Sequence, residues 1–234
     1  MIIVITLLII LISSLGLIFS GSVVKNWRIT VSQFNVVNDF FKRQLFGFCI
    51  AVIATIFAIT IKGNQFLKIG EILNPPQPIE VLGIDSHATW LNTAFEISIT
   101  LLIVTCLFLY FHLRKMRPLA NLKKEYIYWA VLFALTNSLT EELIYRFVLI
   151  NLLHDQLGIH LLTIISAFAF GIPHYKGMPN GILGILMASF LGFILARSVV
   201  ETQGLMIAWG LHFILDVPII ITLFWTDSHQ EQTT

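Results

Sequence analysis

Runs of apolar residues long enough to cross a lipid bilayer recur along this 234-residue chain, and they constrain its fold more than any other feature. A transmembrane helix needs about 20 mostly apolar residues to cross a hydrocarbon core of roughly 30 Å. We therefore predict an all-α fold, a polytopic transmembrane helical bundle of about seven or eight spans, forming one integral membrane domain over residues 1–234. The predicted spans are 2–20, 44–61, 91–113, 128–153, 158–173, 180–196 and 204–225.

The composition agrees with a chain whose main solvent is lipid. Of its residues 57% are hydrophobic and 12% are charged, whereas a soluble domain has roughly 45–50% apolar and about 25% charged residues. A net charge of +1 gives no support to a nucleic-acid partner. The partners that we expect are the lipid bilayer and a membrane-associated peptide or protein.

The distribution of lysine and arginine predicts the orientation, because cytoplasmic loops hold an excess of both. Only Lys62, Lys68 and Arg197 fall on one side of the predicted spans, and Arg146 lies inside one. The N-terminus should therefore face out and the C-terminus in, as in a multi-pass protein of the cell membrane. The basic residues predicted to face the cytoplasm are Lys25, Arg28, Lys42, Arg43, Arg114, Lys115, Arg117, Lys123, Lys124 and Lys176.

Two adjacent carboxylates and an arginine lie inside the predicted span 128–153. Ionisable groups at membrane depth cost at least ~2.5–3.5 kcal/mol each on insertion scales and usually face the bundle interior or a water-filled cavity. Glu142 and Arg146 are four residues apart, so they share a helix face and can pair. Glu141 projects about 100° away from that face. Its carboxylate is left free to accept a proton, which makes Glu141 the better candidate for a general base.

Two further ionisable motifs follow in the same half of the chain. Span 158–173 runs into Phe170-Gly171-Ile172-Pro173-His174, and span 204–225 contains His212 and Asp216 at helical spacing. Counting about 1.5 Å per residue from the predicted outer ends places Glu141, His174, His212 and Asp216 within a common layer about 12 Å thick. A single site that contains all four groups is compatible with these depths.

Taken together, the three motifs resemble those of the CPBP family, which includes the CAAX proteases and bacteriocin-processing or immunity proteins. The resemblance covers residues 128–225, the predicted catalytic-motif region. It implies a multi-helix intramembrane glutamic endopeptidase that hydrolyses a peptide bond of a membrane-associated substrate, either CAAX-type or bacteriocin-like. The motifs are Glu141-Glu142-x-x-x-Arg146, Phe170-x-x-x-His174 and His212-x-x-x-Asp216.

The resemblance also implies roles for these residues. Glu141 and His174 would activate a water molecule, and His212 with Asp216 would stabilise the oxyanion. The supporting residues would be Glu142, Arg146 and Phe170. Asparagine often occupies the last position of the third motif in the family, and its NH2 can donate to an oxyanion, whereas an ionised Asp216 would repel one. Asp216 must therefore be protonated, orient His212 by accepting its proton, or serve another purpose.

Three alternatives stay open at this point. No cofactor is expected, but Glu, His and Asp are zinc ligands, so a metal-dependent membrane enzyme is one alternative, although no HExxH segment occurs. A non-catalytic peptide-binding or bacteriocin-immunity protein is the second. An ion-coupled transporter with Glu141 as its proton site is the third.

Overall fold

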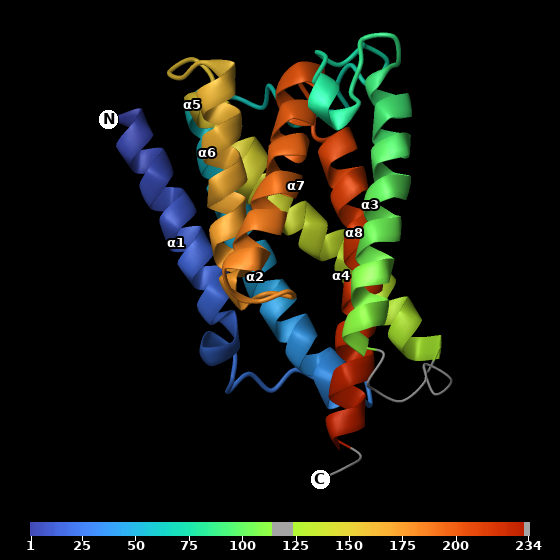
Figure 1. Cartoon of the computed structure of the whole chain (residues 1–234). Helices are drawn as coiled ribbons and strands as arrows, with labels where there is room; N and C mark the ends of the chain where they lie inside the picture. The colour runs from blue at the N-terminus through green and yellow to red at the C-terminus, as the bar shows by residue number, and fades with distance from the viewer. Residues whose placement is uncertain (114–123, 232–234) are drawn as a thin grey trace.

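The chain was analysed as a computed structural model, which describes residues 1–113 and 124–231. Within these residues it is a bundle of helices without strands (Figure 1), so the predicted all-α membrane fold is confirmed. Arg114, Lys115, Arg117 and Lys123, which contribute to the predicted orientation, lie outside the described residues. The helical elements are α1 (Ile2–Val23), α2 (Asn35–Lys62), the 3-10 segment η1 (Glu80–Leu82), α3 (Trp90–Leu113), α4 (Lys124–Glu142), the π-helix η3 (Leu143–Val148), α5 (Leu149–Leu153), α6 (Ile159–Gly171), the 3-10 segment η4 (Ile172–Lys176), α7 (Gly181–Thr202) and α8 (Met206–Glu231).

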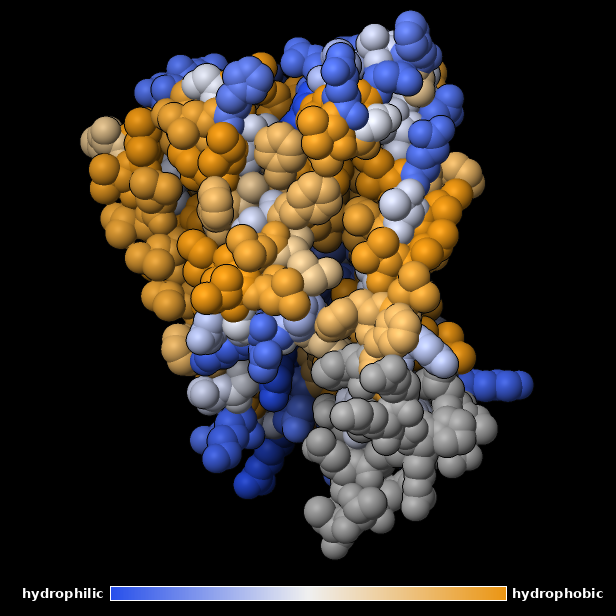
Figure 2. Space-filling model, in the orientation of Figure 1, coloured by the Kyte–Doolittle hydropathy of each residue, from blue (hydrophilic) through white to orange (hydrophobic). Residues whose placement is uncertain are grey.

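Five described helices are long and apolar enough to span a membrane: α1, α2, α3, α7 and α8. The prediction of seven spans differs from this count at two places. Helix α6 has only 13 residues, which is about 20 Å of helix and shorter than a hydrocarbon core of roughly 30 Å. Helix α4 has 19 residues, four of them charged. Figure 2 shows the apolar side chains as a broad orange belt between bluer ends.

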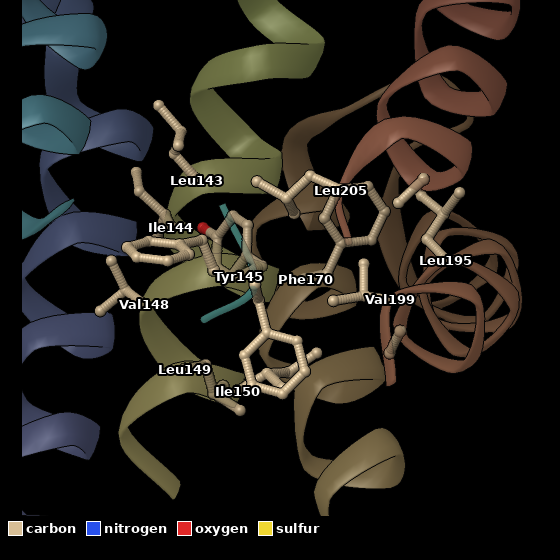
Figure 3. Packing of buried hydrophobic residues seen from close by; sticks show 14 of the residues in the cluster. Leu143, Ile144, Tyr145, Val148, Leu149, Ile150, Phe170, Leu195, Val199 and Leu205 are labelled. Carbon is tan, nitrogen blue, oxygen red and sulfur yellow. The ribbon is translucent and has the colours of Figure 1, made fainter. Parts of the chain in front are cut away.

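The site is positioned by a helical rod over residues 124–153, formed by α4, η3 and α5 without a break. In Figure 1 this rod starts at the lower right and crosses obliquely behind α7 and α8. Every residue from Glu142 to Leu153 is buried. Figure 3 shows side chains of η3 and α5 packed with Phe170, Leu195, Val199 and Leu205 from the neighbouring elements.

Helices α6 and α7 pack closely because small residues line their contact. A Cβ atom on Gly192 would lie 3.1 Å from the backbone of Ala167, and one on Gly184 would lie 2.6 Å from the carbonyl oxygen of His174. Small residues let helix backbones approach in this way. The small residues of α7 therefore serve packing within the chain, and this packing holds the end of α6 beside the rod.

The connection between α2 and α3 is fastened to the turn between α7 and α8. The backbone N–H of Glu71 donates to the carbonyl of Thr202 at 2.7 Å, and that of Leu205 donates to Lys68 at 3.0 Å. Gly70, with φ +86°, approaches Gly204 so closely that a Cβ atom on it would lie 2.8 Å from the Gly204 Cα. These contacts fix where α8 begins, and α8 carries the third motif.

Candidate active site

The buried centre of the site is the pair Glu142 and Arg146 on the rod. Both side chains are fully buried, and Nη1 of Arg146 lies 3.2 Å from Oε1 of Glu142. Nη2 donates to the carbonyl oxygen of Gly192 on α7 at 3.3 Å. The guanidinium also lies over the ring of Phe170, 4.2 Å from its centroid. A buried charge needs such partners to be tolerated, and here they connect the rod to α6 and α7.

The π-helix η3 gives this part of the rod additional contacts. A π turn disrupts the regular α-helical hydrogen bonding. The carbonyl oxygen of Tyr145 accepts from Oγ of Ser166 on α6 at 2.7 Å, and the Tyr145 hydroxyl hydrogen-bonds to Ser14 on α1 at 3.0 Å. The segment that carries Arg146 is thereby fixed to two other helices.

His212 reaches the same carboxylate from α8. Its Nδ1 lies 2.8 Å from Oε1 of Glu142, and an ionised carboxylate can only accept, so Nδ1 carries the hydrogen. Nε2 then faces the other two carboxylates, at 3.7 Å from Oε2 of Glu141 and 3.6 Å from Oδ1 of Asp216. The ring also packs edge to face on Phe170, with centroids 5.3 Å apart. The orientation of His212 is thus set by Glu142 and Phe170 rather than by Asp216.

Glu141 differs from its neighbour in the way that the sequence predicts. Its side chain is 16% exposed, and no ion pair in the described part of the chain joins it to Arg146. Oε1 accepts from Nδ2 of Asn137 at 3.4 Å. Oε2 is buried and accepts no hydrogen bond from any group that the structure describes. One oxygen of Glu141 is therefore held, and the other is free to bind a proton donor.

His174 lies in η4, just beyond the end of α6. Its Nδ1 is 2.8 Å from the carbonyl oxygen of Phe170. A carbonyl oxygen only accepts, so Nδ1 carries the hydrogen, and in the neutral ring Nε2 is the acceptor. The His174 ring packs against the Phe170 ring with centroids 4.7 Å apart. No hydrogen bond or ion pair joins His174 to Glu141 among the described residues, so the structure links these two predicted partners only through Phe170 and His212.

Asp216 is held by an amide that the sequence analysis did not single out. Its Oδ2 accepts from Nδ2 of Asn137 at 2.9 Å, and Oδ1 of Asn137 accepts from Nε2 of Gln44 on α2 at 2.8 Å. Asn137 lies one turn before Glu141 on α4. A polar amide four residues before the candidate base, inside a predicted span, is the signal that could have drawn attention to it.

The charges of the site do not balance. Three carboxylates, those of Glu141, Glu142 and Asp216, face one guanidinium and the imidazole of His212. With all three carboxylates ionised and the imidazole protonated, one negative charge is left without a counter-charge, which suits a site that takes a proton from water. No group of three or more His, Cys, Asp or Glu side chains in the described ranges has an arrangement that would hold a metal ion.

The residues of the site differ in exposure, and its half-buried members form what we call the half-open side. Glu141, Asn137 and His174 are half-buried, whereas His212, Glu142 and Arg146 are buried. Figure 2 shows the apolar surface hollowed near its middle, with hydrophilic colour visible at depth between orange side chains.

The part of the chain that contains the site matches a known protein family. The family model described as type II CAAX prenyl endopeptidase, Rce1-like, matches residues 123–218. These residues contain all three motifs and every ionisable group of the site. Over these residues, which are less than half of the chain, the sequence is similar to the CAAX prenyl endopeptidases of this family model. No curated protein and no solved structure matches it. The matched family is one of endopeptidases, and the five described helices that are long and apolar enough to span a membrane agree with an integral membrane protein.

Proposed function

We propose that this protein is an intramembrane endopeptidase that hydrolyses a peptide bond with a water molecule activated by Glu141. The observation that carries the proposal is the state of the Glu141 carboxylate. One of its oxygens is held by Asn137, and the other, Oε2, is buried at the edge of the half-open side without a hydrogen-bond partner among the described residues. An acceptor fixed in this way can take the proton of a bound water.

The reaction would proceed through groups of this chain. The water oxygen forms a bond to the scissile carbonyl carbon while its proton passes to Glu141, and Nε2 of His174 accepts a hydrogen bond from the second water hydrogen. Protonated His212 would donate from Nε2 to the oxyanion, since a donor aimed at developing charge is the main source of stabilisation in acyl transfer. The C–N bond then breaks, and Glu141 returns its proton to the leaving nitrogen. Glu142 and Arg146 hold His212 and the rod in place.

The substrate class to test first follows from the matched family, whose description names CAAX prenyl endopeptidases. We propose a membrane-associated peptide substrate, with a prenylated CAAX C-terminus as the first candidate and a bacteriocin-like precursor as the second. We expect no cofactor. A bacteriocin-immunity protein that binds its peptide without cleaving it is the alternative that the experiment must separate.

The test compares wild type with E141Q and H174A in cleavage of fluorescence-quenched peptides, with and without a prenylated CAAX cysteine, in proteoliposomes. The matched control is E96Q, because Glu96 is an exposed glutamate on another helix, α3. We expect E141Q to lose activity by at least about a hundredfold and E96Q to keep it. Each reaction is repeated with a metal chelator. Activity that vanishes on chelation would place the site in the metal-dependent class, and binding without cleavage by folded wild type would favour the immunity alternative.

We also propose that the N-terminus faces out and that substrate enters from the cytoplasmic side. Helix α1 begins at the upper end of the bundle and α8 runs to the lower end in Figure 1, and the basic residues predicted to face the cytoplasm outnumber those predicted to face out. Single cysteines at Ile172 and Asp85, in a background without Cys49 and Cys106, test this. A membrane-impermeant reagent added outside intact cells should label position 85 and leave position 172 unlabelled. The reverse pattern would overturn the orientation.

A further inference from the structure

We propose that Asn137 is a positioning residue that fixes which oxygens of Glu141 and Asp216 face the reacting groups, an inference that rests on the proposed function. Asn137 lies outside the three motifs that carry the family resemblance. Its Nδ2 is 2.9 Å from Oδ2 of Asp216 and 3.4 Å from Oε1 of Glu141. A single amide therefore bridges the half-buried carboxylate of Glu141 and the buried carboxylate of Asp216.

The bridge decides the orientation of both carboxylates. Glu141 uses Oε1 toward Asn137 and presents Oε2 to Nε2 of His212, and Asp216 uses Oδ2 toward Asn137 and presents Oδ1 to the same nitrogen. The two carboxylates thus lie between an amide on one side and an imidazole on the other. Without the amide, the two like charges would share only the imidazole of His212, and like charges close together destabilise each other. Asn137 keeps them close enough to share His212.

Gln44 sets the direction of the amide. Ionised carboxylates only accept hydrogen bonds, so the Asn137 atom that faces them must be its NH2 group. Oδ1 of Asn137 then faces α2, where Nε2 of Gln44 donates to it at 2.8 Å. Gln44 contacts neither carboxylate in the described structure. It therefore offers a way to disturb the amide without touching the two groups that the amide positions.

The experiment measures kcat and KM with the peptide that wild type cleaves best, and the thermal midpoint of each purified variant. N137D, which places a third carboxylate at the bridge, should lower kcat by about a hundredfold with little change in KM, since misplacement by about 1 Å can cost that much. The exchange variant N137D/D216N again pairs an amide with a carboxylate, but the amide is now at position 216 and the carboxylate at position 137. Gln44 can still donate to the carboxylate introduced at position 137. The kcat of N137D/D216N should be at least about tenfold higher than that of N137D. The effects of the two substitutions on the thermal midpoint should be non-additive.

Two variants of Gln44 test the direction of the amide. In Q44E the new carboxylate can only accept, so it draws the Asn137 NH2 away from Asp216, and kcat should fall by at least about tenfold. Q44M can neither donate nor accept and should be less harmful. Q156E is the matched control, since Gln156 is exposed in the turn after α5. N151D is the control for structural damage, because Asn151 is a buried amide on the same rod that donates to Gly63 instead.

The outcomes separate the inference from the proposed function. If wild type cleaves and N137D/D216N is no more active than N137D, or if Q44E behaves like Q156E, the inference is overturned. If N151D lowers kcat as strongly as N137D at equal folded fraction, the effect of N137D is structural and the inference again falls. If folded wild type cleaves nothing, the proposed function is overturned, and additive thermal midpoints for N137D and D216N would then overturn the Asn137 contact as well.

Discussion

Glu142 and His212, 70 positions apart in the chain, are joined by a hydrogen bond of 2.8 Å between Oε1 and Nδ1. The same oxygen is 3.2 Å from Nη1 of Arg146. One oxygen of the more buried of the two adjacent glutamates thus joins α8 to the rod. Glu141 and Glu142 are adjacent but can have different chemical roles. The burial and the partners of a carboxylate, not its position in a motif, decide its chemistry.

Removal of Arg146 should destabilise the protein strongly. R146M leaves the Glu142 carboxylate buried without its guanidinium, and breaking a buried ion pair costs about 3–5 kcal/mol. We expect a loss of that size in the free energy of unfolding, measured by reversible unfolding in mixed micelles. E142Q/R146M should regain part of it, because no uncompensated charge is left.

The control for that measurement is R28M. Arg28 is exposed in the connection between α1 and α2, and such a surface substitution should stay within about 0.5 kcal/mol of wild type. Equal stabilities of R146M and R28M would show that the buried pair does not stabilise the fold.

The hydrogen bond between Tyr145 and Ser14 should contribute to holding α1 on the bundle. Y145F and S14A each remove one partner at 3.0 Å and should lower the free energy of unfolding by about 1 kcal/mol. The double variant should lose less than the sum of the two. Full additivity in this double-mutant cycle would contradict a direct interaction.

Gly171 should not tolerate a methyl group. A Cβ atom there would lie 1.9 Å from Oγ of Ser189 and 2.8 Å from the carbonyl oxygen of Ile185, so G171A should cost about 1–3 kcal/mol through overpacking between α6 and α7. Gly210 on α8 has open space at the same position. G210A should be neutral or gain about 0.5–1 kcal/mol, because alanine is the better helix residue. Thermal unfolding of the two variants side by side tests both expectations.

The ion pair between Asp155 and Lys62 should make stability depend on acid pH. Nζ of Lys62 hydrogen-bonds to the Asp155 carboxylate at 2.7 Å and holds its pKa below the usual range. A lowered folded pKa stabilises the protein above the unfolded value of about 3.9, and this contribution is lost as the pH falls through the folded pKa. D155N should therefore melt earlier than wild type near neutral pH, and the difference should close below about pH 4.

D85N is the control for this pH series, because within the described residues the Asp85 carboxylate accepts only from the nearby backbone N–H of His87. A difference between D155N and wild type that is unchanged from neutral to strongly acidic pH would rule out the ion pair as its cause. Added salt should also reduce the difference at neutral pH, since the pair is at the surface.

The helices and the local pairing in the site could be predicted from the sequence, and the long-range contacts could not. The lengths of the apolar runs predicted α1, α2, α3, α7 and α8. The spacing of four residues predicted the contact of Glu142 with Arg146. Both rules use information from within a single helix. The contacts of His212 with Glu142 and of Asn137 with Asp216 cross between helices, and no spacing rule links positions so far apart. The shortness of α6 was also missed, since an apolar run does not reveal where a helix gives way to a 3-10 turn.

The π-helix η3 changes how the rod should be drawn on a helical wheel. An α-helix advances about 100° per residue, whereas a π turn takes in more residues and so advances less with each. Residues after Val148 consequently fall out of phase with those before Leu143. The face that carries Asn137 and Glu141 to the open side is not continued by α5, whose five residues are all buried. A wheel with one constant angle over residues 124–153 would assign an outward face to side chains that lie at the centre of the protein.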